Sequence, residues 1–295
     1  MSDSTNGLDG DCELPAAEEE KEQIDLDEEI RRPLWHRGRQ KGVNRKRGLA
    51  REIAAQPREL LVEEFDTDRS NAPSRTARGK RYFDEHRKGY PQCDVPSDRR
   101  EENLMMALFN EGSIQLPDGT SKVLILDYQT PLYAWRDDGL GKIDATGLMP
   151  GGSLCLMELK APRDDSGDSP LRALLECLAY AAAARANHVD IVAEIMDSAD
   201  RRNFVKFVDG RSTVLVFGPQ SWWDSWVNSG PAGDWRPPLA EFSDYLANAL
   251  DIEIAFGSLE GFEFTRADHG TRLRKPRIRG EARMVDIEGL PGLRT

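Results

Sequence analysis

Residues 142–160, KIDATGLMPGGSLCLMELK, decide the predicted fold. Two apolar runs on either side of a Pro-Gly-Gly turn predict neighbouring strands of a β-hairpin. If the hairpin folds about Gly151, Asp144 and Glu158 lie directly opposite each other, because each is seven positions from that glycine. Side chains alternate between the faces of a strand, so Lys160 shares the face of both acids. The segment therefore predicts two carboxylates and an ammonium group in one patch.

The residues around this patch are apolar, as in the Leu-Cys-Leu-Met run before Glu158, which indicates a central, buried strand. Buried charges are tolerated only when they are paired or bind a metal. Two carboxylates supply the oxygen ligands that Mg²⁺ or Mn²⁺ prefers, and these ions keep waters that a substrate phosphate can displace. A lysine beside such an ion can orient an attacking water. The pattern favours phosphodiester hydrolysis over an exposed salt bridge between strands, which would stabilise the chain little.

Charge is unevenly distributed along the chain, whose net charge is −12. Residues 1–30 hold twelve acidic residues and one lysine, and their low apolar content predicts a disordered acidic tail. Residues 31–97 predict a basic, partly ordered extension, since 31–51 hold nine Arg and Lys and no acid. The nuclease-like domain is expected at 98–265, and residues 266–295 predict a second basic tail.

The basic segments are typical of chains that contact a nucleic-acid backbone. The overall acidity does not argue against such a partner, because the tail accounts for almost all of it. The sequence shows no secretory signal, no CxxC pair and no apolar run of roughly 20 residues that could cross a membrane. It predicts a cytoplasmic protein with reduced cysteines and no membrane partner. A homodimer or a larger defence or repair complex is compatible with these features.

Hydrophobic periodicity predicts an α/β domain from about residue 98 onward. A helix is expected to precede a three-stranded meander, and a helical crossover leads to the next strand. The predicted strands span residues 122–133, 142–148, 153–160, 213–217 and 252–256, and the predicted helices span 98–112, 169–186, 188–195, 221–227 and 239–250. This order predicts a mixed β-sheet flanked by helices.

With these elements in place, the sequence resembles the PD-(D/E)XK nuclease superfamily, which has the restriction-endonuclease-like fold. Asp144 matches its first acid, and Glu158-Leu159-Lys160 matches its (D/E)XK element. Glu176 and Tyr180 resemble a variant of the QxxxY element, and their spacing places both on one helical face. Two positions depart from the pattern, since Ile143 replaces the proline and Glu176 replaces the glutamine. The resemblance leaves residues 1–97 unexplained.

The resemblance implies a nuclease, most readily a DNA endonuclease, that uses Mg²⁺ or Mn²⁺, with exonuclease action left open. Asp144 and Glu158 would bind the metal, and Lys160 would position the attacking water. An acid on the helix before the sheet, Glu102 in preference to Glu101, would complete the metal site, because Glu102 lies close to the edge of the inward face. Glu176 and Tyr180, which form the QxxxY-like element, would lie on the helix that follows the hairpin. They would support the site or contact the phosphate.

Other interpretations stay open. A catalytically inactive module of the same fold would bind nucleic acid or a protein partner, with Glu158 and Lys160 neutralising each other. A glycosidase that uses Asp144 and Glu158 as its acid pair fits less well, because the adjacent lysine would keep both acids ionised. The sequence does not distinguish DNA from RNA, or endonuclease from exonuclease action. A tryptophan-rich segment is expected to be core rather than a base-stacking surface: Trp222, Trp223 and Trp226.

Overall fold

The computed structural model describes residues 48–83, 100–132, 141–161, 168–197, 211–227, 234–265 and 277–293. All of them belong to one unit, Pro33–Thr295. The predicted acidic tail and the start of the predicted basic extension, residues 1–47, lie outside the described residues. Both therefore stay predictions.

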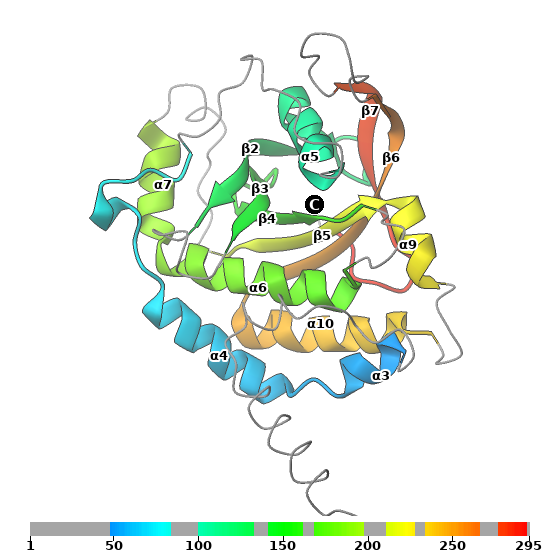
Figure 1. The fold of residues 1–295 in the computed structure, drawn as a ribbon, viewed down its shortest axis with the longest axis horizontal. Coiled ribbons are helices and arrows are strands. Elements are labelled where there is room, and N and C mark those ends of the chain that lie inside the picture. Colours follow the sequence, from blue (N-terminus) through cyan, green and yellow to red (C-terminus); the bar gives the residue numbers. More distant parts are fainter. Residues whose placement is uncertain are drawn as a thin grey trace, which may run out of the picture. The chain divides into compact units, whose positions relative to one another are not determined.

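A closed β-barrel forms the centre of this unit (Figure 1). Its described strands follow one another around the ring in chain order: β1 (Ser113–Gln115), β2 (Lys122–Pro131), β3 (Lys142–Leu148), β4 (Leu154–Leu159), β5 (Thr213–Pro219), β6 (Glu253–Thr265) and β7 (Arg277–Asp286). Strands β1 to β4 pair antiparallel, β4 to β6 run parallel, and β6 and β7 form an antiparallel hairpin. A parallel pairing between Gln115 of β1 and Arg283 of β7 closes the ring.

The predicted fold is wrong in one respect. The restriction-endonuclease-like fold has an open mixed sheet, whereas here β1 pairs with β7 and closes the sheet into a barrel. Neither strand is evident from the sequence: β1 has three residues, too few for a periodic pattern. β7 lies in the segment predicted as a basic tail, where arginines obscure a buried alternation of Ile278, Ala282 and Met284.

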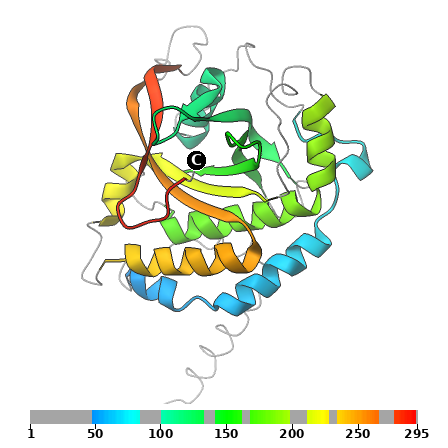
Figure 2. The same ribbon diagram turned by 180° about the vertical axis from the view of Figure 1, so that it is seen from behind.

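Helices cover the barrel on several sides. Helix α4 packs against both α6 and α10, and α3 packs against α10 (Figures 1 and 2). The helices labelled in Figure 1 are α3 (Leu49–Ala54), α4 (Arg58–Asn71), α5 (Arg100–Glu111), α6 (Pro170–Ala186), α7 (His188–Asp197), α9 (Gln220–Val227) and α10 (Arg236–Leu250). None of the described helices combines the length and apolarity needed to cross a lipid bilayer.

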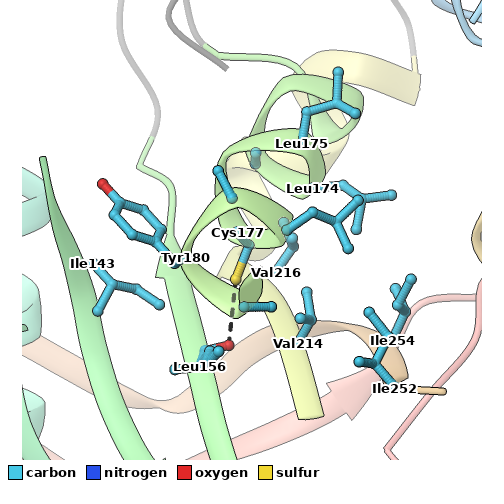
Figure 3. Close-up of a cluster of buried hydrophobic side chains, with 14 of the residues drawn as sticks. Ile143, Leu156, Leu174, Leu175, Cys177, Tyr180, Val214, Val216, Ile252 and Ile254 are labelled. Atoms are coloured by element: carbon cyan, nitrogen blue, oxygen red, sulfur yellow. Dashed lines mark hydrogen bonds between the residues drawn. The ribbon is translucent and has the colours of Figure 1, made fainter. Parts of the chain in front are cut away.

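The barrel wall separates two hydrophobic cores. On one face, α5 packs against side chains that include Met157 and Phe217. On the other face, α6 packs its buried residues, among them Leu174 and Cys177, against Leu156 and its neighbours (Figure 3). Adjacent residues of β4 thus enter different cores, as strand alternation requires. Every residue of β4 is buried, which confirms the predicted central strand.

The start of α6 shows why the helix begins there. The Ser169 hydroxyl accepts a hydrogen bond from the backbone N–H of Arg172, and Pro170 occupies the first turn. Both signals are confirmed. The run of alanines that follows is buried, so α6 approaches the sheet closely. The helix therefore holds the residues of its sheet-facing side near β4.

Residues 74–83 are held against α7 by hydrogen bonds and an ion pair to carboxylates of that helix. The backbone N–H groups of Tyr82 and Phe83 donate to Glu194 Oε2 and Oε1 at 2.7 and 2.8 Å. Arg81 Nε lies 3.4 Å from Glu194 Oε1, and Ser74 Oγ donates to Asp190 at 2.8 Å. Residues of the predicted basic extension are therefore part of the packed unit.

Candidate active site

The ladder between β3 and β4 places the predicted acids opposite each other. It pairs Ala145 with Met157, and the same register continued by one residue pairs Asp144 with Glu158. The hairpin register predicted about Gly151 is therefore confirmed. Both acids lie at one end of the barrel, where β3 begins and β4 ends.

The predicted acids and lysine form a buried charged cluster. The exposed fractions of Asp144, Glu158 and Lys160 are 9%, 3% and 4%. Lys160 Nζ lies 2.7 Å from Glu158 Oε1, and the Lys160 backbone N–H donates to Phe217 O of β5 at 2.8 Å. This burial contradicts the alternative of an exposed salt bridge. The lysine is held at its backbone by β5 and at its ammonium group by Glu158.

Two further carboxylates reach the ammonium group from the side of α6. Lys160 Nζ lies 3.3 Å from Asp168 Oδ2 and 3.4 Å from Glu176 Oε2. Asp168 lies two residues before α6 and also pairs with Arg172 at 2.6 Å. Glu176 faces the cluster, as predicted. Among the described residues, acidic groups at this end of β4 outnumber basic ones, which favours binding of a cation.

Each oxygen of the Asp144 carboxylate accepts one hydrogen bond. The backbone N–H of Leu159 donates to Oδ2 at 3.0 Å, and Gln129 Nε2 of β2 donates to Oδ1 at 2.9 Å. A carboxylate oxygen can accept more than one such bond. Asp144 is therefore oriented from both neighbouring strands and still has acceptor capacity for a ligand.

The acid that α5 brings to the cluster is Glu101. Its Oε1 accepts a hydrogen bond from the backbone N–H of Ala161 at 3.1 Å, directly after Lys160 in the chain. Glu102, the preferred residue in the sequence prediction, acts instead on Tyr128, whose pKa is raised by burial and by the negative charge of Glu102. The structure thus places the other member of the pair beside the metal-binding candidates.

Tyr180 lies one helical turn beyond Glu176 and close to the start of β3. Its hydroxyl donates to the Lys142 carbonyl oxygen at 3.1 Å, and its ring lies beside Ile143 (Figure 3). Burial raises the pKa of Tyr180 well above its ordinary value, and the charges of Glu158 and Glu176 add to the rise. Tyr180 is therefore near the carboxylates, but its hydroxyl is hydrogen-bonded to the backbone at the start of β3, the strand that contains Asp144.

Burial shapes the protonation of the cluster. It raises the pKa of Asp144 to about 7, with Lys160 opposing the rise and Glu101 adding to it. It also raises the pKa of Glu158 well above the ordinary value, and the charge of Asp144 adds to this effect. For Lys160, burial lowers the pKa, but the carboxylates Glu158 and Glu176 outweigh it and hold the pKa well above its usual range. The lysine therefore stays protonated at neutral pH.

The residues present fit a hard divalent cation. Glu158 Oε2 is buried and has no hydrogen-bond partner, although leaving such an atom unpaired is costly. Across the described ranges, no three His, Cys, Asp or Glu side chains gather at metal-ligand spacing. Mg²⁺ commonly uses one or two carboxylates and completes its shell with water and substrate phosphate. Asp144 and Glu158, with Glu101 beside them, meet that requirement.

Several residues at the cluster are not evident from the sequence. Gln129 and Asp168 contact Asp144 and Lys160, yet no motif marks either position. Trp222, Trp223 and Trp226 are buried, as predicted, and do not form a base-stacking surface. Trp235, for which the sequence made no prediction, is buried as well. The described cysteines, Cys155 and Cys177, are free, as predicted.

Comparison of the chain with protein-family models, with curated proteins and with solved structures gives no match. The resemblance to PD-(D/E)XK nucleases therefore rests on the motif residues themselves.

Proposed function

We propose that the chain is a Mg²⁺-dependent nuclease that hydrolyses phosphodiester bonds, with DNA as the first substrate to test. One observation carries the proposal. Asp144, Glu158 and Lys160 meet in a buried cluster in which Glu158 Oε2 has no hydrogen-bond donor. Two buried carboxylates with a spare acceptor atom and an adjacent ammonium group suit a cation and a phosphate together.

Asp144 and Glu158 would hold the cation, and Glu101 lies where it can contribute directly or through water. A bound Mg²⁺ would neutralise charge on the phosphate and lower the pKa of a water molecule. The residues must give up any protons they carry before they bind it. Because burial raises the pKa of Asp144 to about 7, a cation and protons compete for this site near neutral pH.

Lys160 contributes positive charge and hydrogen bonds rather than acting as a base. Its raised pKa keeps the ammonium group protonated, so Nζ can donate to a water or to a phosphate oxygen but cannot take up a proton. Asp168 and Glu176 lie 3.3 and 3.4 Å from Nζ and would still hold the ammonium group if Glu158 bound a cation instead. The lysine is therefore positioned from α6 as well as from β4.

The partner in this proposal is nucleic acid. Support comes from the basic stretch 31–51 of the sequence, which would neutralise backbone phosphates without reading bases. A PD-(D/E)XK-type active site on a barrel, and a cytoplasmic location, are parts of the same proposal.

A non-catalytic binding module is the second candidate. The 2.7 Å contact between Lys160 Nζ and Glu158 Oε1 favours it, because the two charges neutralise each other without any ligand. In that case the cluster would fix the end of β4 and nothing more. The two candidates differ in whether a divalent cation competes successfully for Glu158.

The test uses the full chain with plasmid, linear duplex, single-stranded DNA and RNA, each with and without Mg²⁺. We expect cleavage that requires Mg²⁺ and is lost in Lys160→Met, which keeps the length of the side chain and removes its charge. Lys122→Met is the matched control, since it removes an exposed ion pair with Glu281 at 2.9 Å. Cleavage by the control should equal that of the wild type.

Two results would contradict the proposal. Binding of DNA without Mg²⁺-dependent cleavage of any substrate would favour the binding module. Cleavage that persists unchanged in Lys160→Met and in Asp144→Ala would place the activity elsewhere in the preparation. Cleavage of RNA alone would change the substrate and keep the chemistry.

A further inference from the structure

Gln129 has an unusual backbone for a residue inside a strand. Its φ is 48°, in the left-handed region that non-glycine residues rarely adopt. Asp251, the other described non-glycine residue with positive φ, ends helix α10, where this conformation is common. Gln129 instead lies between two ordinary ladder pairs of β2 and β3. Such strain persists where surrounding contacts impose it, often beside a functional group.

The register of the sheet aligns Gln129 with the cluster. β2 pairs Tyr128 with Ala145 and Thr130 with Ile143, so Gln129 lies opposite Asp144 and the register is the same on both sides of it. Asp144 in turn lies opposite Glu158 on β4. One row across three strands therefore contains an amide and two carboxylates.

The side chain of Gln129 uses this position to hold Asp144. Its Nε2 donates to Asp144 Oδ1 at 2.9 Å, while the Leu159 N–H donates to Oδ2 at 3.0 Å. With either donor alone, the carboxylate could rotate about its last bond. An amide also provides this donor without positive charge, whereas a lysine or arginine here would repel a cation.

We propose that Gln129 is a positioning residue that aims the Asp144 carboxylate at a divalent cation. The inference rests on the proposed function, because it assigns Gln129 a part in the same cation site. Partners that orient a metal ligand typically contribute about 10- to 100-fold to metal affinity. Gln129 acts through Asp144 and does not itself contact the cation or the substrate.

The test measures Mn²⁺ binding to the full chain by titration calorimetry, together with thermal unfolding in metal-free buffer. Gln129→Met keeps the side-chain length and loses the donor. Gln129→Gly also loses the donor, but glycine adopts positive φ without strain. We expect the Kd for Mn²⁺ to rise about tenfold in both variants. The unfolding temperature of Gln129→Gly should stay at or above that of the wild type, which separates positioning from folding.

Gln56→Met is the matched control, because Gln56 Nε2 donates to the Glu52 carbonyl oxygen on α3 at 3.2 Å. It should bind Mn²⁺ like the wild type. Unchanged Mn²⁺ affinity in Gln129→Met, or in Gln129→Gly, would overturn the inference while the proposed function stands. If the wild type itself binds no Mn²⁺, the proposed function fails and the inference fails with it.

Discussion

Two buried glutamates, Glu194 and Glu158, differ in the hydrogen-bond partners of their carboxylate oxygens. Glu194 on α7 is 9% exposed, and both of its oxygens accept backbone N–H groups, from Tyr82 and Phe83. Glu158 on β4 is 3% exposed, with one oxygen on Lys160 and the other without a donor. The first carboxylate is fully used in holding two segments together. The second is buried at comparable depth with one oxygen unpaired.

The difference separates a structural acid from a candidate ligand. A carboxylate whose oxygens are satisfied by the backbone gains little from a cation, because binding would first break those bonds. A carboxylate with an unpaired oxygen beside a second acid gains from any cation that pairs it. Burial and charge alone do not distinguish the two glutamates, but the hydrogen-bond partners of each oxygen do.

The largest expected effect is on catalysis. Glu158→Gln removes one charge with almost no change of shape. We expect Mg²⁺-dependent cleavage to fall at least about a hundredfold, which corresponds to ~2.7 kcal/mol of activation free energy. Glu281→Gln, which loses an exposed ion pair with Lys122, is the control and should cleave normally. A fully active Glu158→Gln would remove the distinction between the two glutamates.

A glycine next to the cluster offers the next test. A Cβ on Gly218 would meet the Lys160 carbonyl oxygen well inside van der Waals contact, whereas a Cβ on Gly151 would meet nothing. Gly218→Ala should therefore lower the free energy of unfolding by about 2 kcal/mol, the usual range for overpacking, and reduce cleavage. Gly151→Ala should change neither. Denaturant unfolding of both variants checks the stabilities, and equal values would contradict the packing argument.

A substitution of Glu194 should affect stability and leave cleavage unchanged. Glu194→Gln replaces one acceptor oxygen with an NH₂ group that faces a backbone N–H. We expect the free energy of unfolding to fall by about 1.5 kcal/mol, because a charge-assisted hydrogen bond is lost. The rate of cleavage at a temperature where the variant is folded should not change. A loss of activity without a loss of stability would show that Glu194 is more than a fastening.

The smallest expected effect is on the pH dependence of cation binding. Because burial raises the pKa of Asp144 to about 7, the ionised fraction rises about tenfold between pH 6 and pH 8. The affinity for Mg²⁺ should rise by at least about the same factor, ~1.4 kcal/mol. Calorimetry at several pH values measures it. The same slope in Asp144→Asn would show that another group titrates.

The contribution of Asp144 to the stability of the metal-free protein changes with pH in the opposite direction, falling as the pH rises. An acid with a raised pKa in the folded state contributes most below its ordinary pKa of about 4, and this contribution is lost as the pH rises through about 7. Asp144→Asn should therefore become more stable relative to the wild type as the pH rises across that interval. Thermal unfolding without metal would show it.

Local patterns predicted the hairpin well. The equal spacing of Asp144 and Glu158 from Gly151 determined their register, because strand alternation leaves few ways to fold a short turn. The capping serine and the proline of α6 fixed the start of that helix for the same local reason. Glu176 then follows on the face that meets the sheet.

Long-range features were not predictable in this way. Closure of the barrel depends on Gln115 meeting Arg283, a pairing between distant segments that no local period encodes. The contact of Gln129 with Asp144 depends on the register of β2, which an irregularity near Leu126 shifts. The choice between Glu101 and Glu102 depends on the rotation of α5. Each requires knowledge of how elements pack, and a single sequence shows only their internal patterns.

The tryptophans near β5 and β6 have a practical consequence. Trp222 and Trp223 lie 4.4 Å apart between ring centres, and the indole N–H of Trp223 donates to the Gly257 carbonyl oxygen at 3.0 Å. The described indoles of Trp222, Trp223, Trp226 and Trp235 are shielded from water, so the emission of these four rings in the folded chain is that of an apolar environment. Solvent reaches these rings on unfolding and shifts the emission to longer wavelength. The molecule thus carries its own optical reporter, and its folding can be followed without a dye.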